Sequence, residues 1–471
     1  MKLTFLGAAG AVTGSCYLLQ TSRATLLLEC GQIQGSPTEE ALNRLPLPIP
    51  ADSIDAVVLS HAHIDHSGRL PLLSRQGYGG PIYTHAATRA LCTVMLRDSA
   101  YLHEKDADWE NRKRRRKGMA LIEPLYTQDD AARVMQQFVG LEFAQQKEIL
   151  PGIQLRLHEA GHILGAAIVE LSIEDLGERR KLVFSGDLGY AAAPVMNDPT
   201  PIAEADLVLL ESTYGDRNHR AFESTLQELR AIFHDAAESG GNVLIPAFAV
   251  GRTQDLLYLM AEHYAEWRLD RWQVFLDSPM GIEATGIYSQ FRHLYRAELF
   301  RDGQHWPVLP NFAATVSSEE SMSLNRIESG AIIIAGSGMC TGGRIRHHLK
   351  HNVWRPQCHV IMIGYQAHGT LGRRLVDGAP RISLWQETIQ VNAKIHTVGG
   401  LSAHADQSGL LEWYGNFKSR PPVCLVHGEE KARHALADKL EERYGVEARR
   451  PIVNDTVSLA CGLTAFSRLW R

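Results

Sequence analysis

Short apolar runs separated by turns fill the first part of the chain. Lys2–Leu6 alternates around Leu3 and Phe5, which is typical of a strand with one buried face. Similar runs predict further strands at Cys16–Gln20, Ala24–Glu29, Ala56–Ser60, Gly152–Leu157, Ala166–Ile173 and Lys181–Ser185. Because few helical stretches lie between them, this part of the chain indicates a packed sheet architecture.

The pattern changes near Glu204, where apolar strands begin to alternate with helices. The expected strands are Leu207–Leu210, Val243–Pro246, Gln273–Leu276, Ala331–Ala335 and His359–Ile363. The expected helices are Ser224–Ser239, Arg252–Ala265, Ile282–Leu294 and Arg344–His351. Such alternation favours a parallel α/β sheet. The strand-rich pattern returns near Gln390 with Gln390–Thr397 and Pro422–Val426, followed by a helix over Glu430–Tyr444. We therefore interpret the central block as a domain inserted into another domain.

Composition and charge then exclude several classes of protein. The chain has 471 residues, with 48 Lys and Arg against 53 Asp and Glu, so its formal charge is −5. This charge excludes a basic protein that coats nucleic acid through its overall field. The apolar runs are too short for a membrane span and the first residues lack a signal-peptide pattern, so we expect a cytoplasmic protein without a membrane partner. The seven cysteines form no CxxC pair, which argues against a zinc ribbon and a disulfide framework.

Histidine, with 21 copies, supplies the candidate chemistry. His61, His63, Asp65 and His66 place four ligand-type side chains directly after the strand Ala56–Ser60. Imidazole and carboxylate together suit Zn²⁺, with Mn²⁺ and Fe as competitors. Because one short loop does not easily direct four side chains at one ion, two adjacent metals are the natural arrangement. The alternative is a polar surface loop.

Three further ligand candidates stand at other expected strand ends. His162 lies in a glycine-flanked turn, Asp187 follows the strand Lys181–Ser185, and His427 follows the strand Pro422–Val426. Each residue alone is a weak signal, because a single His or Asp at a strand end more often caps a turn or satisfies a buried polar group.

Together these residues resemble the dinuclear site of the metallo-β-lactamase fold. Five more motifs resemble the β-CASP branch of that fold: Leu3–Cys16, Leu210–Gly215, Pro246–Arg252, Asp277–Met280 and Ser402–Asp406. That branch includes the mRNA 3′-end cleavage endonuclease and its bacterial and archaeal relatives. The resemblance covers essentially the whole chain. It implies an α/β fold in which residues 1–205 and 391–471 form a metallo-β-lactamase αββα sandwich and residues 206–390 form the inserted β-CASP domain with a parallel sheet.

The resemblance also implies residue roles. One of two Zn²⁺ ions would be held by His61, His63 and His162, and the other by Asp65, His66 and His427, with Asp187 between both. His404 would be the general acid that protonates the leaving oxygen, and Glu211 would orient the His404 ring. Asp65 would be a third catalytic residue. Without the resemblance, we would interpret Glu211 as a cap of the Ser212–Thr213 turn.

The implied activity is hydrolysis of RNA phosphodiester bonds by a metal-bridged hydroxide, giving 5′-phosphate and 3′-hydroxyl ends. A His at position 427 resembles the RNA-cutting members, and an endonuclease is favoured over a 5′ exonuclease. The alternatives are a DNA nuclease on the same scaffold and a small-molecule (thio)ester hydrolase. The expected partner is single-stranded RNA. The sequence leaves open whether the protein forms a homodimer.

One position departs from the family pattern. Glu29 stands where the metallo-β-lactamase fold usually has Asp, so its contact to the metal-binding loop is expected to be rearranged or lost.

The RNA must also be held. The glycine-rich turn at residues 336–344 predicts phosphate contacts from Ser337, Gly338 and Arg344, because such turns present backbone N–H groups. Arg252 and His368 are weaker candidates in neighbouring turns. The dense basic run Arg112–Lys117 is either a track for the RNA backbone or a solvated helix face.

Overall fold

The chain forms two compact units, which we describe separately. The computed structural model describes residues 1–191, 193–300, 309–364 and 366–459. Unit 1 comprises residues 1–193, 197–218 and 404–471, and unit 2 comprises residues 194–196 and 219–403. Within the described ranges, no helix combines the length and the apolar character that a bilayer span requires.

Unit 1 contains two sheets packed face to face. The first sheet has the order β21-β1-β2-β3-β4-β5-β6 and the second has the order β20-β11-β10-β9-β8-β7. The first consists of β1 (Lys2–Gly7), β2 (Cys16–Gln20), β3 (Thr25–Leu28), β4 (Ala56–Val58), β5 (Ile82–His85), β6 (Phe138–Leu141) and β21 (Thr456–Ser458). The second consists of β7 (Gln146–Leu150), β8 (Ile153–Glu159), β9 (Ala167–Asp175), β10 (Glu178–Phe184), β11 (Leu207–Glu211) and β20 (Val423–Val426).

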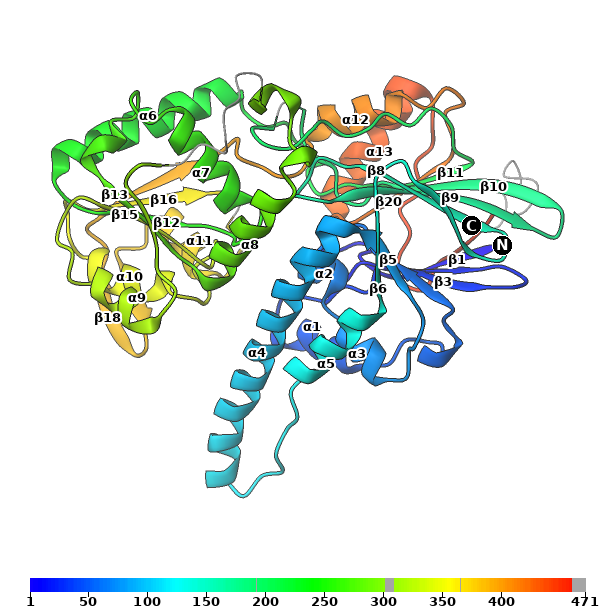
Figure 1. The fold of residues 1–471 in the computed structure, drawn as a ribbon, viewed down its shortest axis with the longest axis horizontal. Coiled ribbons are helices and arrows are strands. Elements are labelled where there is room, and N and C mark those ends of the chain that lie inside the picture. The colour runs from blue at the N-terminus through cyan, green and yellow to red at the C-terminus, as the bar shows by residue number, and fades with distance from the viewer. Residues whose placement is uncertain (192, 301–308, 365, 460–471) are drawn as a thin grey trace. The chain divides into compact units, whose positions relative to one another are not determined.

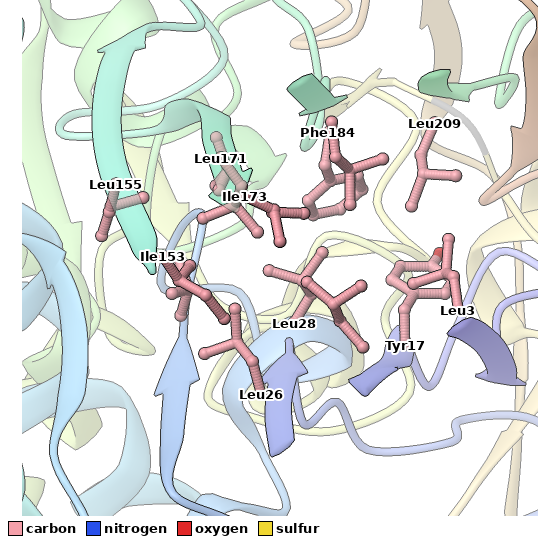
Figure 2. Close-up of a cluster of buried hydrophobic side chains, with 14 of the residues drawn as sticks. Leu3, Tyr17, Leu26, Leu28, Ile153, Leu155, Leu171, Ile173, Phe184 and Leu209 are labelled. Atoms are coloured by element: carbon pink, nitrogen blue, oxygen red, sulfur yellow. The ribbon is translucent and has the colours of Figure 1, made fainter. Parts of the chain in front are cut away.

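Alternating apolar side chains of the two sheets build the core between them. Leu3, Tyr17 and Leu28 point from the first sheet toward Leu171 and Phe184 of the second, and all five side chains are almost fully buried (Figure 2). The alternation expected in the first strand is therefore the alternation of a face packed on another sheet.

Helices cover the outer faces of both sheets, which confirms the expected αββα sandwich (Figure 1). Those on the side of the first sheet are α1 (Pro37–Ala41), α2 (Ile64–Ser67), α3 (Leu70–Arg75), α4 (Ala86–Arg116) and α5 (Gln128–Val134). Those on the side of the second sheet are α12 (Gln407–Gly415) and α13 (Glu430–Tyr444).

Unit 2 is built on a parallel sheet with the strand order β14-β13-β15-β12-β16-β19. Its strands are β12 (Val243–Pro246), β13 (Gln273–Asp277), β14 (Phe312–Ala314), β15 (Ala331–Ala335), β16 (His359–Ile363) and β19 (Lys394–Val398). Its helices are α6 (Phe222–Ser239), α7 (Arg252–Glu262), α8 (Pro279–Gln290), α9 (Ser318–Leu324), α10 (Ile345–Asn352) and α11 (Leu371–Val376). A hairpin of β17 (Arg381–Leu384) and β18 (Glu387–Gln390) completes it. The central strands β15 and β16 are buried throughout, as expected for a parallel sheet with helices on both faces.

Two strands belong to a different unit from the one that the expected limits of the inserted domain gave them. β11 pairs with β10 and β20 in unit 1, although residue 206 was the expected start of the insertion. β19 pairs with β16 in unit 2, although residue 390 was its expected end. The reason is that an apolar run indicates burial and not which of two sheets a strand joins.

A buried carboxylate holds one end of the unit 2 sheet together. Asp277, at the end of β13, accepts hydrogen bonds from Thr315 (2.5 Å), Ser321 (2.6 Å) and Arg344 (2.7 Å), and its other contact is His348 Nε2 at 2.6 Å. Burial opposes the charge, but these bonds, led by that of His348, hold the pKa of Asp277 well below its usual range. The carboxylate therefore ties β13 to α9, to α10 and to the segment after β14.

We expect Asp277→Ala to lower the free energy of unfolding of unit 2 by about 3 kcal/mol, because it leaves buried donors and a cation without their acceptor. Differential scanning calorimetry measures the change. Asp270→Ala, at an exposed position of the same unit, is the control and should change the stability by less than about 0.5 kcal/mol. Equal stability of the two variants would contradict this role of Asp277.

Candidate metal centre

The candidate ligands all lie in unit 1, in the segments that follow or connect strands of its two sheets, and Asp65 and His66 belong to the short helix α2. His61, His63, Asp65 and His66 follow β4, and His162 lies between β8 and β9. Asp187 follows β10, and His427 follows β20. Backbone hydrogen bonds join these loops: Ala167 N donates to Ser60 O (3.0 Å) and His427 N donates to Ala8 O (2.8 Å). Residues far apart in the sequence thus meet at one edge of the sandwich.

Three histidines and one aspartate form the first group. His63 Nδ1 lies 3.1 Å from His61 Nε2 and 3.2 Å from His162 Nε2. Asp187 Oδ2 lies 3.4 Å from His61 Nε2 and 3.6 Å from His162 Nε2. These four ligand atoms are close enough to one another to contact one metal ion.

Asp65, His66 and His427 form the second group. His66 Nε2 lies 3.1 Å from His427 Nε2, and Asp65 Oδ2 lies 3.4 Å from the same His427 atom. Asp187 also reaches this group, because its Oδ2 lies 3.3 Å from His66 Nε2 and its Oδ1 lies 3.5 Å from His427 Nδ1. The two groups therefore share Asp187.

The residues of both groups fit divalent metal ions. Ring nitrogens of neighbouring histidines lie only 3.1–3.2 Å apart, a spacing that suits imidazoles bound to one Zn²⁺ at about 2.0–2.1 Å each. Among the described residues, no group donates a hydrogen bond to the buried Asp187 Oδ1. Burial lowers the pKa of His61 and lowers that of His63 to about 4, so both imidazoles are neutral ligands at neutral pH.

His66 differs from these two histidines in its protonation. Burial opposes a charge on its ring, but the carboxylates of Asp187 and Asp65 outweigh it and raise the pKa of His66. A metal ion at the second group therefore competes with a proton for His66.

Outer hydrogen bonds orient the imidazoles. The nitrogen that faces away from the group lies near Ser60 Oγ in His61 (3.0 Å) and near Glu29 Oε2 in His66 (2.5 Å). Thr213 Oγ1 lies 3.1 Å from His427 Nδ1. Such contacts fix which ring nitrogen presents its lone pair to a metal. These contacts of Ser60 and Thr213 were not predicted from the sequence. The only indication in the sequence is that each is a hydroxyl residue close to a motif residue.

The buried Glu211 and the partly exposed His404 form a pair beside the first group. Glu211 Oε1 lies 3.1 Å from His404 Nδ1 and accepts a hydrogen bond from Leu188 N (2.8 Å), while Oε2 accepts one from Thr213 N (3.2 Å). Glu211 therefore both caps the turn and contacts His404. Burial opposes a charge on His404, but Glu211 outweighs it and raises the pKa of His404. The His404 ring centroid lies 4.5 Å from that of His162.

Three family models match consecutive parts of the chain. The model of the metallo-beta-lactamase superfamily matches residues 9–247, the Beta-Casp domain matches residues 253–375, and the Zn-dependent metallo-hydrolase RNA specificity domain matches residues 388–451. The chain belongs to the β-CASP branch of the metallo-β-lactamase superfamily. The family matches thus confirm the membership that the sequence motifs predicted.

Curated relatives of this β-CASP protein match along nearly its whole length. Ribonuclease TTHA0252 of Thermus thermophilus is 38% identical over 94% of this chain and 96% of its own. The transcription termination factors FttA of Methanosarcina mazei and Thermococcus kodakarensis are each 31% identical over 98% of this chain. The matched regions make up 72% and 71% of the two factors. A crystal structure of a protein of unknown function from Enterococcus faecalis covers 97% of the chain with a TM-score of 0.53 at 13% identity, which shows the fold alone.

Glu29 keeps its contact with the metal-binding loop. The expected loss does not occur: Glu29 Oε1 accepts a hydrogen bond from Ser60 N (2.6 Å) and Oε2 accepts one from Ser60 Oγ (3.0 Å), in addition to its contact with His66. The Glu29 backbone has a φ of 62°, a left-handed conformation that is uncommon for a residue other than glycine. The contact with the metal-binding loop is therefore made from this left-handed backbone position.

The candidate RNA-binding residues lie in unit 2, at or near the carboxyl ends of its strands. Arg344 Nη1 donates to Asp277 and Nη2 donates to Val316 O (2.8 Å), so both nitrogens are already used within the unit. Buried Arg252 has Nη1 3.3 Å from Asp255. Ser337 Oγ accepts hydrogen bonds from the turn itself, Gly338 O accepts one from Gln366, and His368 is exposed. Arg344 thus serves as the partner of the buried Asp277, and a phosphate contact of Arg344 stays a prediction.

We expect Glu29→Gln to lower the affinity for Zn²⁺ by about 10–100-fold, because an uncharged amide orients the His66 ring less strongly. A competition titration with a chromogenic chelator measures this affinity. Glu39→Gln, which changes an exposed helix cap in the same unit, is the control. Identical zinc affinities of the two variants would show that Glu29 has only a packing role.

Proposed function

We propose that this β-CASP protein is a metal-dependent ribonuclease that cuts single-stranded RNA internally. The observation that carries the proposal is the shared Asp187, which lies within 3.6 Å of ring nitrogens of both histidine groups. The ribonuclease named among the relatives supports an RNA substrate, and so does the match to an RNA specificity domain over residues 388–451.

The proposed cofactor is two Zn²⁺ ions per chain. His61, His63 and His162 would hold one ion, Asp65, His66 and His427 the other, and Asp187 both. When bound, such ions supply a nucleophile at neutral pH and neutralise charge on the scissile phosphate. All seven side chains come from one chain, so the centre needs no second copy of the protein.

His404 is the proposed general acid. Its Nδ1 faces the Glu211 carboxylate, so the proton for the leaving 3′-oxygen would be donated from Nε2. Glu211 favours the protonated ring and fixes its orientation. Asp65, the more exposed carboxylate of the centre, is proposed to accept a proton during the attack. The products would carry 5′-phosphate and 3′-hydroxyl ends. The candidate RNA contacts of unit 2 remain those expected from the sequence: Ser337, Gly338, Arg344, Arg252 and His368.

We expect His404→Ala to slow RNA cleavage by at least about 100-fold, because the leaving oxygen loses its proton donor. The metal content should stay near about two ions per chain, as measured by inductively coupled plasma mass spectrometry. Asp187→Ala is the contrasting variant and should lose both cleavage and metal. A His404→Ala protein that cleaves normally would contradict its assignment as the acid.

We expect a 5′-labelled RNA to give labelled fragments of several intermediate lengths rather than labelled mononucleotides. The matching single-stranded DNA should be cut at least about tenfold more slowly. Gel mapping of 5′-labelled and internally labelled substrates measures both results. Release of labelled mononucleotides alone would replace the endonuclease with a 5′ exonuclease, and equal cleavage of DNA would remove the RNA specificity.

A further inference from the structure

Helix α4 connects the metal centre of unit 1 to a remote surface. Its first turn contacts the loop that carries His162, because Thr88 Oγ1 donates to Gly165 O (2.7 Å). The helix has 31 residues, so it extends over about 45 Å. Figure 1 shows that its last turns extend beyond the sheets of unit 1, accompanied by the returning segment that leads to α5. A ligand on these turns would be well separated from the centre.

One face of these turns packs against the returning segment. The ring of His103 lies 4.9 Å from the ring of Tyr126. Asn111 exchanges two hydrogen bonds of 2.9 Å with the backbone of Ile122. Glu104 accepts a hydrogen bond from Gln128 N (2.9 Å). These contacts fix the rotation of the helix about its axis, and hence which side chains face outward.

The opposite face carries aromatic and cationic side chains at helical spacing. We call this face the α4 strip, and its members are Tyr101, Lys105, Trp109, Arg112 and Arg116. Successive members are three or four residues apart, so they follow one another along one side of the helix. Tyr101 is 46% exposed and Trp109 is 60% exposed. Lys105 Nζ lies 5.2 Å from the centre of the Tyr101 ring, and Lys113 Nζ lies 3.0 Å from the centre of the Trp109 ring.

The cations of the α4 strip form no ion pairs among the described residues. In the part of the chain that the structure describes, no ion pair involves Lys105, Arg112 or Arg116, whereas Glu110 pairs with Lys113 and Arg114 beside the strip. A solvated helix face would explain these cations. It would not explain a tryptophan and a tyrosine exposed between them.

From this arrangement we propose that the α4 strip binds a single strand of the RNA substrate, outside the metal centre. Cations that contact phosphates and aromatic faces that stack with bases are the two elements of single-strand recognition. A second copy of the strip would be repelled by the same charge. The inference rests on the proposed function for the identity of the strand, and its binding is measured without cleavage.

The strip begins 13 residues after Thr88, about 20 Å farther along the helix axis. A strand must therefore be long to occupy both the strip and the centre. The strip should strengthen the binding of an RNA of about 30 nucleotides and have no effect on one of about 6.

The first test reverses charge on the strip. Arg112→Glu/Arg116→Glu should weaken binding of a 5′-fluorescein phosphorothioate RNA of about 30 nucleotides at least about tenfold, measured by fluorescence anisotropy on the metal-loaded protein. The slope of log affinity against log salt should fall by about 1.4, since each lost phosphate contact removes about 0.7. Arg179→Glu/Lys439→Glu makes the same charge change at exposed positions elsewhere in unit 1, and should keep the affinity and slope of the unsubstituted protein.

The second test removes an aromatic face without a change of charge. Trp109→Ala should weaken binding of the same RNA about tenfold, and Trp109→Phe should restore most of it, because phenylalanine still offers a face to stack on. Leu121→Ala is the control, because Leu121 is also apolar and exposed but lies off the helix. All variants should cleave the RNA of about 6 nucleotides at the rate of the unsubstituted protein.

The outcomes separate the strip from the centre. If the charge-reversed protein binds the long RNA as its control does, the α4 strip is not an RNA site. Equal losses with the short RNA would also overturn the proposal, because the variants would then act on the centre. A change in sedimentation with unchanged RNA affinity would reassign the strip to self-association. If the unsubstituted protein cleaves no RNA while the strip variants still lose binding, the proposed function fails and the strip stands.

Discussion

The metal centre depends on the apolar contact between the two sheets of unit 1. Ligands reach it from the ends of β4 in one sheet and of β10 and β20 in the other, so the position of one sheet on the other fixes their distances. Side chains such as Leu28 and Phe184 hold that position from between the sheets. Ring nitrogens about 3 Å apart tolerate little sliding, and a well-packed core supplies the required rigidity.

Buried charge has different uses in the two units. Asp277 in unit 2 is fully satisfied by four partners and joins elements of the sheet. Asp187 in unit 1 is equally buried, but within the described residues its Oδ1 accepts no hydrogen bond. A buried carboxylate that keeps free acceptor capacity beside imidazoles is suited to binding a cation, whereas a saturated one is suited to holding a fold.

Much of the fold could be predicted from apolar patterning, and the compact His61–His66 motif was sufficient to predict a metal site. The pairing of Glu211 with His404 could not be derived from spacing, since 193 positions separate them; only the family resemblance indicated it. The pairing of Arg344 with Asp277 could not be predicted, because a cation in a glycine-rich turn looks the same whether it faces solvent or a buried acid. The exchange of β11 and β19 between the expected domains has a similar cause, because strand patterns carry no information about pairing partners.

The order of the ligands along the chain has a consequence for how the centre is assembled during synthesis. His61, His63, His162 and Asp187 are all present once the first 187 residues have left the ribosome. His427 and β20 follow only after the whole of unit 2. A growing chain therefore contains one complete ligand group and one incomplete group until unit 2 has been made. The second candidate ligand group is thus completed only after the inserted unit has been made.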